Sequence, residues 1–508
     1  MAWKRSSSFS TFRLLRYIAI GASVGIGGAA MYYVGANQGF TISSKLTPVA
    51  GKPLGVRIEN IVACSVVALS TVVVIGVGTQ RIFGASPVER LRDAIPPSLR
   101  EAMRQIEGAL KPILDSVADT RHPLLLNLAA VARLQEELTV AHPTGLSICQ
   151  NRDVVADALH WMRFASCAYG FAVCKALGLT GDFSMQTVRK GAMAQTTNIT
   201  QVQEIADKLW IVKHTNLRDR QDVLMYSNAI FNHVHSPCFY IALDHNMRAV
   251  VLSVRGSMSV GDTLTDLVCE STAFLSGEAH AGIAAGANNV LAQARETLVD
   301  VLTRFSDEEY KLVVTGHSLG AGTAILLTML LLDDPIFVTC QVECWAFAPP
   351  PVFTPLEKIS PRCHRAIKCF VYRNDLVPRL SLFSVRRLCL QVKAADSMPL
   401  KAITRLMLAY GTCDQEKRER ADFMVLFRQL KHRCGVAAPP FATPGQIYWM
   451  LDSDGRFYTT TSREFRSVLL KADMLLSHLP SSYECGLQKT FHLLHRMANR
   501  TLLICSSL

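Results

Sequence analysis

The sequence contains no Cys-x-x-Cys pair, although it has 15 cysteines. They are scattered irregularly from Cys64 to Cys505 without a repeated spacing, so the pattern argues against a disulfide framework and favours a reducing compartment. His233 and His235 form a His-x-His pair, but they are not set in a known zinc-ligand spacing. We therefore expect no metal site, and no cofactor is required by the chemistry derived below.

Acidic residues are missing from the start of the chain, where no Asp or Glu precedes Glu59. Residues 17–36 and 60–78 carry no charged side chain, and each stretch is about as long as a bilayer core requires. Joined by a short loop, they predict a hairpin of two transmembrane helices. Basic residues before the first stretch and after the second place the rest of the chain on the cytoplasmic side.

Two other interpretations of the N-terminus stay open. The first apolar stretch has some features of a signal-peptide core, and residues 1–16, rich in Ser and Arg, resemble a mitochondrial presequence. We expect a multi-pass protein with two spans in the endoplasmic reticulum or plasma membrane, with a mitochondrial membrane as the alternative.

Nucleic acid is not the expected partner, despite a formal net charge of +12. No module of interleaved basic and aromatic residues is visible, so attraction to anionic lipid headgroups is the simpler interpretation of the charge. A hydrophobic fraction of 49% and a mean hydropathy of +0.21 are high for a soluble enzyme and agree with a bilayer as partner.

A Gly-x-Ser-x-Gly pattern occurs at Gly316–Gly320, between an apolar run and a helix-like segment. Glycines two before and two after Ser318 allow a sharp turn between a strand and a helix, which exposes the hydroxyl and leaves the N–H of Leu319 at a helix N-terminus. The bare pattern also occurs by chance as a glycine-containing loop. Because both flanks fit, we interpret Ser318 as a nucleophile.

A serine nucleophile needs a base, an orienting acid and donors for the oxyanion. Asp375 follows the apolar run 366–372, just beyond the end of an expected strand, and His478 lies in a loop closed by Pro480. Ser318, Asp375 and His478 stand in the chain order of the α/β-hydrolase triad. Upstream, Ser257 follows a strand-like run and a glycine, so its N–H is a candidate oxyanion donor together with that of Leu319.

Other histidines and aspartates fit these roles less well. His317 lies inside the turn, where a side chain directed beneath the turn is expected, and His280 opens a helix. The positions of the remaining candidates argue against a catalytic role. His492 and His495 fall on a basic, solvated tail, and Asp333 and Asp334 mark the end of the helix after Ser318. Asp244 and Asp262 precede the serine, which is the wrong chain order for this fold.

These residues together resemble a known family. The segments Val254–Ser257, His280–Ile283, Gly316–Gly320 and Asp375–Arg379 are similar to motifs of the class 3 lipases, most closely the sn-1-specific diacylglycerol lipases. The resemblance spans roughly residues 146–480. It implies that Ser318 is the nucleophile, Asp375 the orienting acid, His478 the general base, and Ser257 and Leu319 the oxyanion donors. Two predicted spans depart from the four-span appearance of the animal members.

The expected fold is an α/β-hydrolase with a mostly parallel sheet, because strand-like runs alternate with helix-like segments. Strands are expected at residues 239–243, 249–254, 312–314, 342–347, 367–372 and 445–450, and one long helix at 153–177. The predicted organisation is a basic N-terminal segment (1–16), two membrane helices (17–36 and 60–78), a helical linker (79–150), the lipase-like domain (151–490) with an insertion (382–447), and a basic and apolar tail (491–508). The insertion is expected to form a flap over the site.

The function that follows is a membrane-anchored serine lipase acting on an acyl ester of diacylglycerol. A triacylglycerol lipase or a phospholipase A1 is an alternative within the same chemistry. A catalytically silent lipid-binding scaffold that kept the fold is the alternative of a different class.

Overall fold

The computed structural model describes residues 120–121, 127–128, 130–132, 135, 146–149, 151–181, 199–227, 236–257, 271–398, 441–451, 457–471 and 473–505. Nearly all of them belong to one compact unit, made of Pro96–Leu470 and Met474–Leu508. The predicted membrane hairpin and most of the predicted linker lie outside the described residues. None of the helices in the described ranges combines the length and the apolar character that a bilayer crossing needs.

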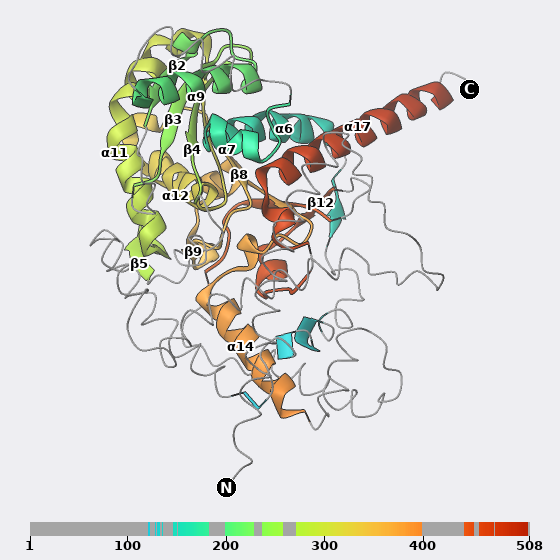
Figure 1. Cartoon of the computed structure of the whole chain (residues 1–508). Coiled ribbons are helices and arrows are strands. Elements are labelled where there is room, and N and C mark those ends of the chain that lie inside the picture. The colour runs from blue at the N-terminus through green and yellow to red at the C-terminus, as the bar shows by residue number, and fades with distance from the viewer. Residues whose placement is uncertain are drawn as a thin grey trace. The chain divides into compact units, whose positions relative to one another are not determined.

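A 9-stranded sheet forms the centre of this unit (Figure 1). In spatial order its strands are β1 (Ser147–Ile148), β12 (Phe457–Thr460), β11 (Gln446–Met450), β10 (Ile367–Tyr372), β8 (Val342–Phe347), β7 (Lys311–His317), β4 (Ala249–Val254), β3 (Phe239–Asp244) and β2 (Val223–Tyr226). The strands from β4 to β11 run parallel to one another. Each strand outside them is antiparallel to its neighbour.

The sheet is therefore mixed, and the expectation of a mostly parallel sheet is correct only for its centre. The antiparallel pairs β3–β4 and β11–β12 join strands that are close in sequence, and a short hairpin can only connect antiparallel strands. Strands β1, β2 and β12 were not predicted, because they are too short to show a periodicity. A 3-stranded sheet was not predicted either; it consists of β5 (Ser271–Phe274), β6 (Gly277–His280) and β9 (Phe353–Thr354).

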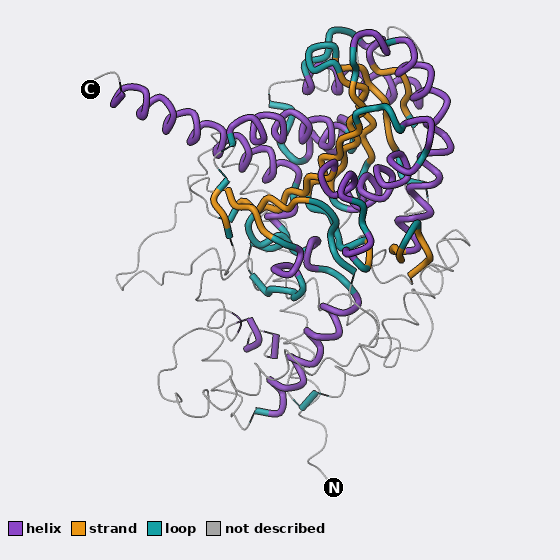
Figure 2. Tube along the Cα trace, turned by 180° about the vertical axis from the view of Figure 1, so that it is seen from behind, coloured by secondary structure: helices purple, strands orange, loops and turns teal. Residues whose placement is uncertain are grey.

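Helices cover both faces of the central sheet (Figure 2). One face is covered by α6 (Arg152–Cys167), with α7 (Phe171–Ala176), α9 (Ile199–Thr215) and α17 (Pro480–Cys505) packed around it. The other face is covered by α12 (Leu319–Asp333), with α11 (Ala281–Arg304) and α13 (Pro361–Ala366) against it. The described 3₁₀ turns are η2 (Arg220–Asp222), η3 (Ser306–Glu308), η4 (Pro335–Phe337), η5 (Leu356–Lys358), η6 (Val377–Arg379), η7 (Ser462–Phe465) and η8 (Leu476–His478).

The expected long helix at residues 153–177 is instead two helices, α6 and α7, and this correction has a local cause. Gly170 between them has φ +81°, a conformation that breaks a helix and favours glycine. The N–H of Phe171, at the start of α7, donates to the buried carboxylate of Asp207 on α9 at 2.7 Å. Tertiary contact with α9 therefore overrides the continuous helical pattern.

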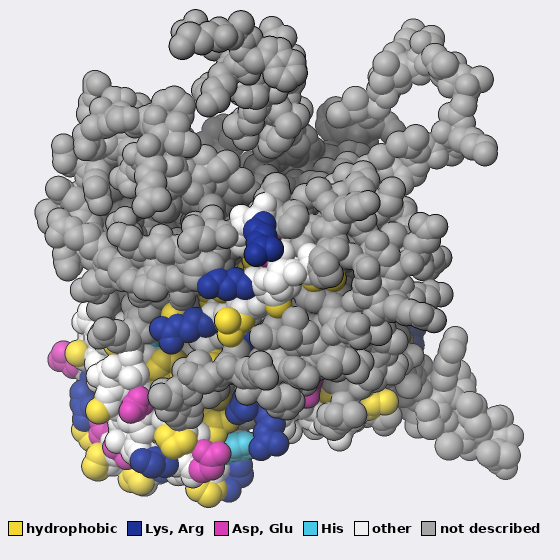
Figure 3. Space-filling model, turned by 90° about the horizontal axis from the view of Figure 1, so that it is seen from below, with side chains coloured by type: hydrophobic (Ala, Val, Ile, Leu, Met, Phe, Trp, Pro, Cys, Tyr) yellow, Lys and Arg dark blue, Asp and Glu magenta, His cyan; other side chains and the backbone are white. Residues whose placement is uncertain are grey.

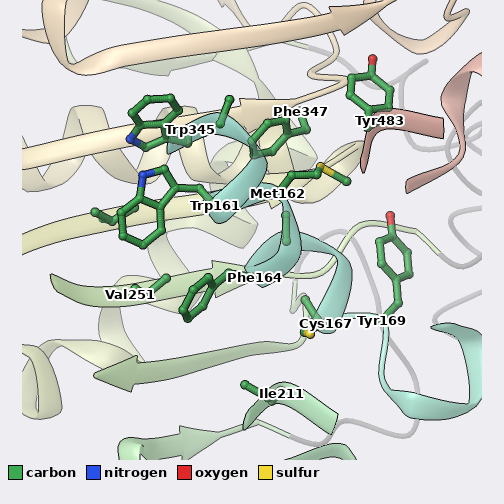
Figure 4. Close-up of a cluster of buried hydrophobic side chains, with 14 of the residues drawn as sticks. Trp161, Met162, Phe164, Cys167, Tyr169, Ile211, Val251, Trp345, Phe347 and Tyr483 are labelled. Carbon is green, nitrogen blue, oxygen red and sulfur yellow. The ribbon is translucent and has the colours of Figure 1, made fainter. Parts of the chain in front are cut away.

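The core on the α6 face contains a row of aromatic rings that crosses the strands. Phe370 on β10 stacks on Phe347 of β8 with ring centroids 5.1 Å apart, and on Tyr448 of β11 at the same distance. Tyr448 in turn stacks on Phe457 of β12 at 5.3 Å. Cross-strand aromatic pairs stabilise a sheet beyond the area that they bury. Trp161 and Phe164 on α6 pack into the same cluster (Figure 4).

The predicted insertion at residues 382–447 is described only at its two ends. It begins with helix α14 (Leu382–Ser397), whose N-terminus is closed by a capping box at Ser381 and Ser384. Near its other end, Ala442 bridges to Phe353 of β9, and the last two predicted residues, 446–447, already belong to β11. Residues 399–440 lie outside the described residues, so the flap stays a prediction.

The return of the chain into β11 depends on Gly445, which gives a stability prediction. Gly445 has φ +86°, and an added Cβ would collide with the backbone carbonyl of Ile367 in β10. Gly178 has φ +73° but open space around it, so Gly178→Ala is a matched control for the backbone conformation alone. We expect Gly445→Ala to lower the free energy of unfolding by about 1–3 kcal/mol more than Gly178→Ala does, measured by denaturant unfolding. Equal losses would show that β10 yields to the added methyl group.

Candidate active site

Ser318 occupies a sharp turn between β7 and α12. Its backbone has φ 60° and ψ −130°, a strained conformation for a residue with a side chain. The turn is close-packed, since a Cβ on Gly320 would collide with the Val254 carbonyl and one on Gly316 would meet Gly320. These two contacts explain why the serine is flanked by glycines on both sides.

The three predicted triad side chains meet at the carboxyl edge of the sheet. The Nε2 of His478 lies 2.9 Å from Ser318 Oγ, and its Nδ1 lies 3.0 Å and 3.1 Å from the two oxygens of Asp375. Ser318 is 2%, His478 6% and Asp375 0% exposed. A hydroxyl, an imidazole and a carboxylate in this order can transfer the serine proton to the imidazole while the carboxylate orients the ring.

Asp375 is held by more than His478. It follows β10, and its carboxylate accepts hydrogen bonds from the backbone N–H of Val377 at 2.9 Å and from the hydroxyl of Tyr483 at 2.6 Å. The Tyr483 oxygen itself accepts from the N–H of Tyr372 at 3.0 Å. Burial, and next the nearby Asp375 charge, raise the pKa of Tyr483 well above its usual value, which keeps the hydroxyl protonated as a donor.

Arg379, the last residue of the Asp375 motif, is also buried. Its guanidinium lies over the rings of Trp449 and Phe465, at 5.4 Å and 4.9 Å from their centroids, and one amino group donates to the Glu464 carbonyl at 2.9 Å. Burial lowers the pKa of Arg379 to about 10, and the charge of Asp375 opposes that shift. This packing holds the loop after Asp375 against β11.

The two predicted oxyanion donors lie on neighbouring segments. Val254 of β4 is paired with Gly316 of β7, and Ser257 and Leu319 each follow three residues beyond that pair. The segments are in close contact, because a Cβ on the intervening Gly256 would lie 3.1 Å from the Ser318 Cβ. As the first residue of α12, Leu319 has no intrahelical acceptor for its N–H. Leu319 directly follows Ser318, and Ser257 directly follows Gly256, which lies against Ser318. The donor role of both N–H groups stays a prediction.

The competing residues lie elsewhere or do other work. His280 caps α11 by accepting from the Ile283 N–H at 3.3 Å, and Asp244 pairs with His160 at 2.6 Å. His495 is exposed and contacts Arg152. His492 is exposed on α17, and Asp333 is the last residue of α12. Asp334 forms an ion pair with Arg295. Asp262 lies outside the described residues.

His317 is closer to the site than the sequence suggested. Its side chain is buried with its ring centroid 4.8 Å from that of His478, and its Nδ1 lies 2.9 Å from the Tyr169 hydroxyl. Tyr169 and Tyr483 were both missed, because no local motif in one sequence separates them from other core tyrosines. The only sequence signals that could have pointed to them are that Tyr169 directly precedes Gly170 and that Tyr483 lies five residues after His478.

The strand, turn and helix around Ser318, with the mixed sheet behind them, define an α/β-hydrolase architecture. Residues 251–385, which contain Ser318 and Asp375, match the family model described as Lipase (class 3). The resemblance to class 3 lipases is thus confirmed for these residues. His478 lies outside the matched residues, so its place in the site rests on the geometry above.

The chain is similar to diacylglycerol lipases. It is 35% identical to diacylglycerol lipase-beta of Mus musculus over 190 residues, which cover 35% of this chain and 26% of that protein. It is 33% identical to diacylglycerol lipase-alpha of Homo sapiens over 290 residues, which cover 50% of this chain and 27% of that protein. The chain thus matches about a quarter of the length of these relatives.

The chain is also similar to solved structures of fungal lipases. A lipase from Rhizopus microsporus var. chinensis superposes with a TM-score of 0.39 at 15% identity, covering 66% of this chain and 90% of that chain. A triacylglyceride lipase from Rhizomucor miehei gives a TM-score of 0.38 at 15% identity, covering 66% of this chain and 96% of that chain.

The hydroxyl of Tyr483 gives a prediction about the acid. Tyr483→Phe removes a hydrogen bond to a buried carboxylate, which is worth about 1.5–3 kcal/mol. If the site hydrolyses esters, we expect kcat for a soluble ester to fall by about 10-fold or more with little change in KM, because Asp375 then orients His478 less firmly. Steady-state kinetics of the variant check this, and an unchanged kcat would show that Val377 and His478 suffice to hold the carboxylate.

Proposed function

We propose that this protein is a membrane-anchored serine lipase that hydrolyses an acyl ester of diacylglycerol to monoacylglycerol and a free fatty acid. The observation that carries the proposal is the continuous hydrogen-bonded chain from Ser318 through His478 to Asp375, set on a strained turn. A strained, buried, hydrogen-bonded serine is costly to maintain, which argues against a silent scaffold. The substrate class is supported by the names of the relatives at 33% and 35% identity.

The proposed reaction proceeds through an acyl-enzyme. His478 takes the proton of Ser318 as its oxygen attacks the ester carbonyl, and Asp375 stabilises the imidazolium that forms. The N–H groups of Ser257 and Leu319 donate to the tetrahedral oxyanion. The imidazolium then protonates the leaving glycerol oxygen, and a water molecule, activated by His478, releases the fatty acid. Apart from the ester substrate and this water molecule, each step uses only side chains and backbone groups of this chain.

The bilayer is the proposed partner, and surface charge supports it. Basic side chains lie beside hydrophobic ones on the described part of one face (Figure 3). On α14, Arg386, Leu390 and Lys393 are exposed at positions about one helical turn apart. Such a mixture of cationic and apolar groups suits an anionic lipid surface. We place the catalytic part on the cytoplasmic side of the membrane that the N-terminal hairpin spans.

The first test removes each member of the triad. Ser318→Ala, Asp375→Asn and His478→Ala should each lower kcat by about 10⁴-fold while the protein stays folded, because the three side chains act as one unit. A fluorophosphonate probe should label the wild type and not Ser318→Ala. Ser253→Ala removes another buried serine hydroxyl, which donates to the Phe164 carbonyl at 3.0 Å, and should retain activity and labelling.

Each outcome of this test is informative. Labelling that persists in Ser318→Ala would refute the nucleophile, and near-normal turnover in His478→Ala would refute the base. A folded wild type that neither labels nor turns over any of a panel of diacylglycerol, triacylglycerol and phospholipid substrates would favour the silent scaffold.

The second test concerns the anchor. Removing residues 1–78 should leave hydrolysis of a soluble ester unchanged but lower turnover of diacylglycerol in vesicles, because tethering raises the effective concentration of enzyme at its substrate. Residual binding of the truncated protein to anionic vesicles should weaken with salt. Carbonate extraction of the full-length protein is the direct measurement, and release into the supernatant would refute the two spans.

A further inference from the structure

A pair of buried side chains, Tyr169 and His317, continues the hydrogen-bonded site beyond the triad. The ring of His317 packs against that of His478 with an interplanar angle of 36° and against Tyr483 at 5.5 Å in an edge-on arrangement. The Tyr169 hydroxyl lies 2.9 Å from the His317 Nδ1. Figure 4 shows Tyr169 and Tyr483 on separate segments at the same side of the core cluster. The ring of His317 therefore contacts both the Tyr169 hydroxyl and the imidazole of His478.

His317 stays neutral in this position. Burial, and next the positive charge that His478 can carry, hold the pKa of His317 well below its usual value, and the backbone of His478 only partly opposes that shift. A neutral ring matters, because a charged one would repel the imidazolium that forms on His478 during the reaction. With Nε2 protonated, Nδ1 of the neutral ring is an acceptor for the Tyr169 hydroxyl.

Tyr169 is suited to be that donor. Burial raises the pKa of Tyr169 far above its usual value, while the charges of Arg255 and Asp375 act on it in opposite directions. Its backbone is fixed as well, since it precedes Gly170 at the break between α6 and α7, and the N–H of Phe171 is bound by Asp207. The hydroxyl is therefore protonated and presented from a rigid turn.

The same hydroxyl also borders the segment that carries the oxyanion donor. A Cβ on Gly256 would lie 2.5 Å from the Tyr169 hydroxyl and would also collide with the His317 carbonyl. Gly256 immediately precedes Ser257, so the hydroxyl packs against the backbone that sets the direction of the Ser257 N–H. The Tyr169 hydroxyl thus contacts both the His317 ring, which packs on His478, and the backbone that carries the Ser257 N–H.

We propose that Tyr169 and His317 are positioning residues for the general base. The Tyr169 hydroxyl fixes the tautomer and the plane of His317, and the neutral His317 ring in turn fixes the plane of His478, so that Nε2 meets Ser318 Oγ. The inference rests on the proposed hydrolase function of the triad. The groups that face His317 are Tyr169 before α7, His478 in η8 and Tyr483 in α17, with Arg255 and Asp375 nearby.

A double-mutant cycle on the full-length protein tests the proposal. Tyr169→Phe and His317→Phe each keep a ring and remove one half of the hydrogen bond. Each should lower kcat for a soluble ester by about 10-fold or more, and the double variant should lose no more than the worse single variant, because the two changes remove the same interaction. KM should change less than two-fold, since neither side chain is assigned to substrate binding.

Tyr240→Phe is the matched control. Tyr240 is a buried tyrosine of the same core cluster, and its hydroxyl donates at 2.7 Å to the Phe164 carbonyl, which Ser253 also binds. The Tyr240→Phe variant should lose about as much stability as the Tyr169→Phe variant but keep the wild-type kcat. Equal kcat values for Tyr169→Phe and Tyr240→Phe, or additive losses in the double variant, would overturn the proposal. If Tyr169→Phe does not fold, His317→Phe against Tyr240→Phe decides in the same way.

Failure of the positioning role can be distinguished from failure of the proposed hydrolase function. A wild-type protein that neither turns over esters nor labels with the fluorophosphonate probe would remove the hydrolase proposal and with it this inference. An active wild type whose kcat is insensitive to Tyr169→Phe and His317→Phe would leave the hydrolase in place and remove only the positioning role.

Discussion

A carboxylate buried away from water must be hydrogen-bonded, and Asp375, which is 0% exposed, imposes that constraint on the whole site. Its donors come from three parts of the chain: the Val377 N–H just after β10, the His478 ring in η8 and the Tyr483 hydroxyl in α17. Satisfying the carboxylate therefore docks the C-terminal helix onto the end of the sheet. The same contacts bring His478, the proposed general base, to Ser318, because His478 and Tyr483 belong to one continuous segment.

Ser318, the proposed nucleophile, is positioned mainly by the backbone. Parallel pairing of β4, β7, β8 and β10 aligns the ends of these strands at one edge, where Ser318 and Asp375 follow β7 and β10. Close backbone approach at Gly316 and Gly320 then holds the strained turn, since no side chain fits there. Strand register and backbone contact position the serine and the acid with little help from side chains.

This difference explains how much of the protein could be predicted from its sequence. The bounds of β4, β8 and β10 were predicted to the residue, because buried parallel strands appear as short apolar runs between turns. The serine and the acid followed, since each lies directly after such a run. The short edge strands were missed because two to four residues carry no periodicity, and the α6–α7 break was missed because it depends on Asp207, far away in the sequence. Tyr169 and Tyr483 were missed because their partners, His317 and Asp375, also lie far away in the sequence.

The position of His478, the proposed base, depends most on side-chain contacts. His478 ends a turn of three residues, η8, that belongs to no strand of the sheet, so no ladder of backbone hydrogen bonds fixes its ring. The ring is fixed instead by Asp375 on one edge, Ser318 on the other and the ring of His317 beside it. In a nearly dry site each of these contacts is electrostatically stronger than in water, and any unpaired polar atom is correspondingly costly. A neutral histidine and protonated tyrosines around a single carboxylate therefore hold the imidazole in place. They do so without adding a second charge that would compete with the imidazolium of the proposed mechanism.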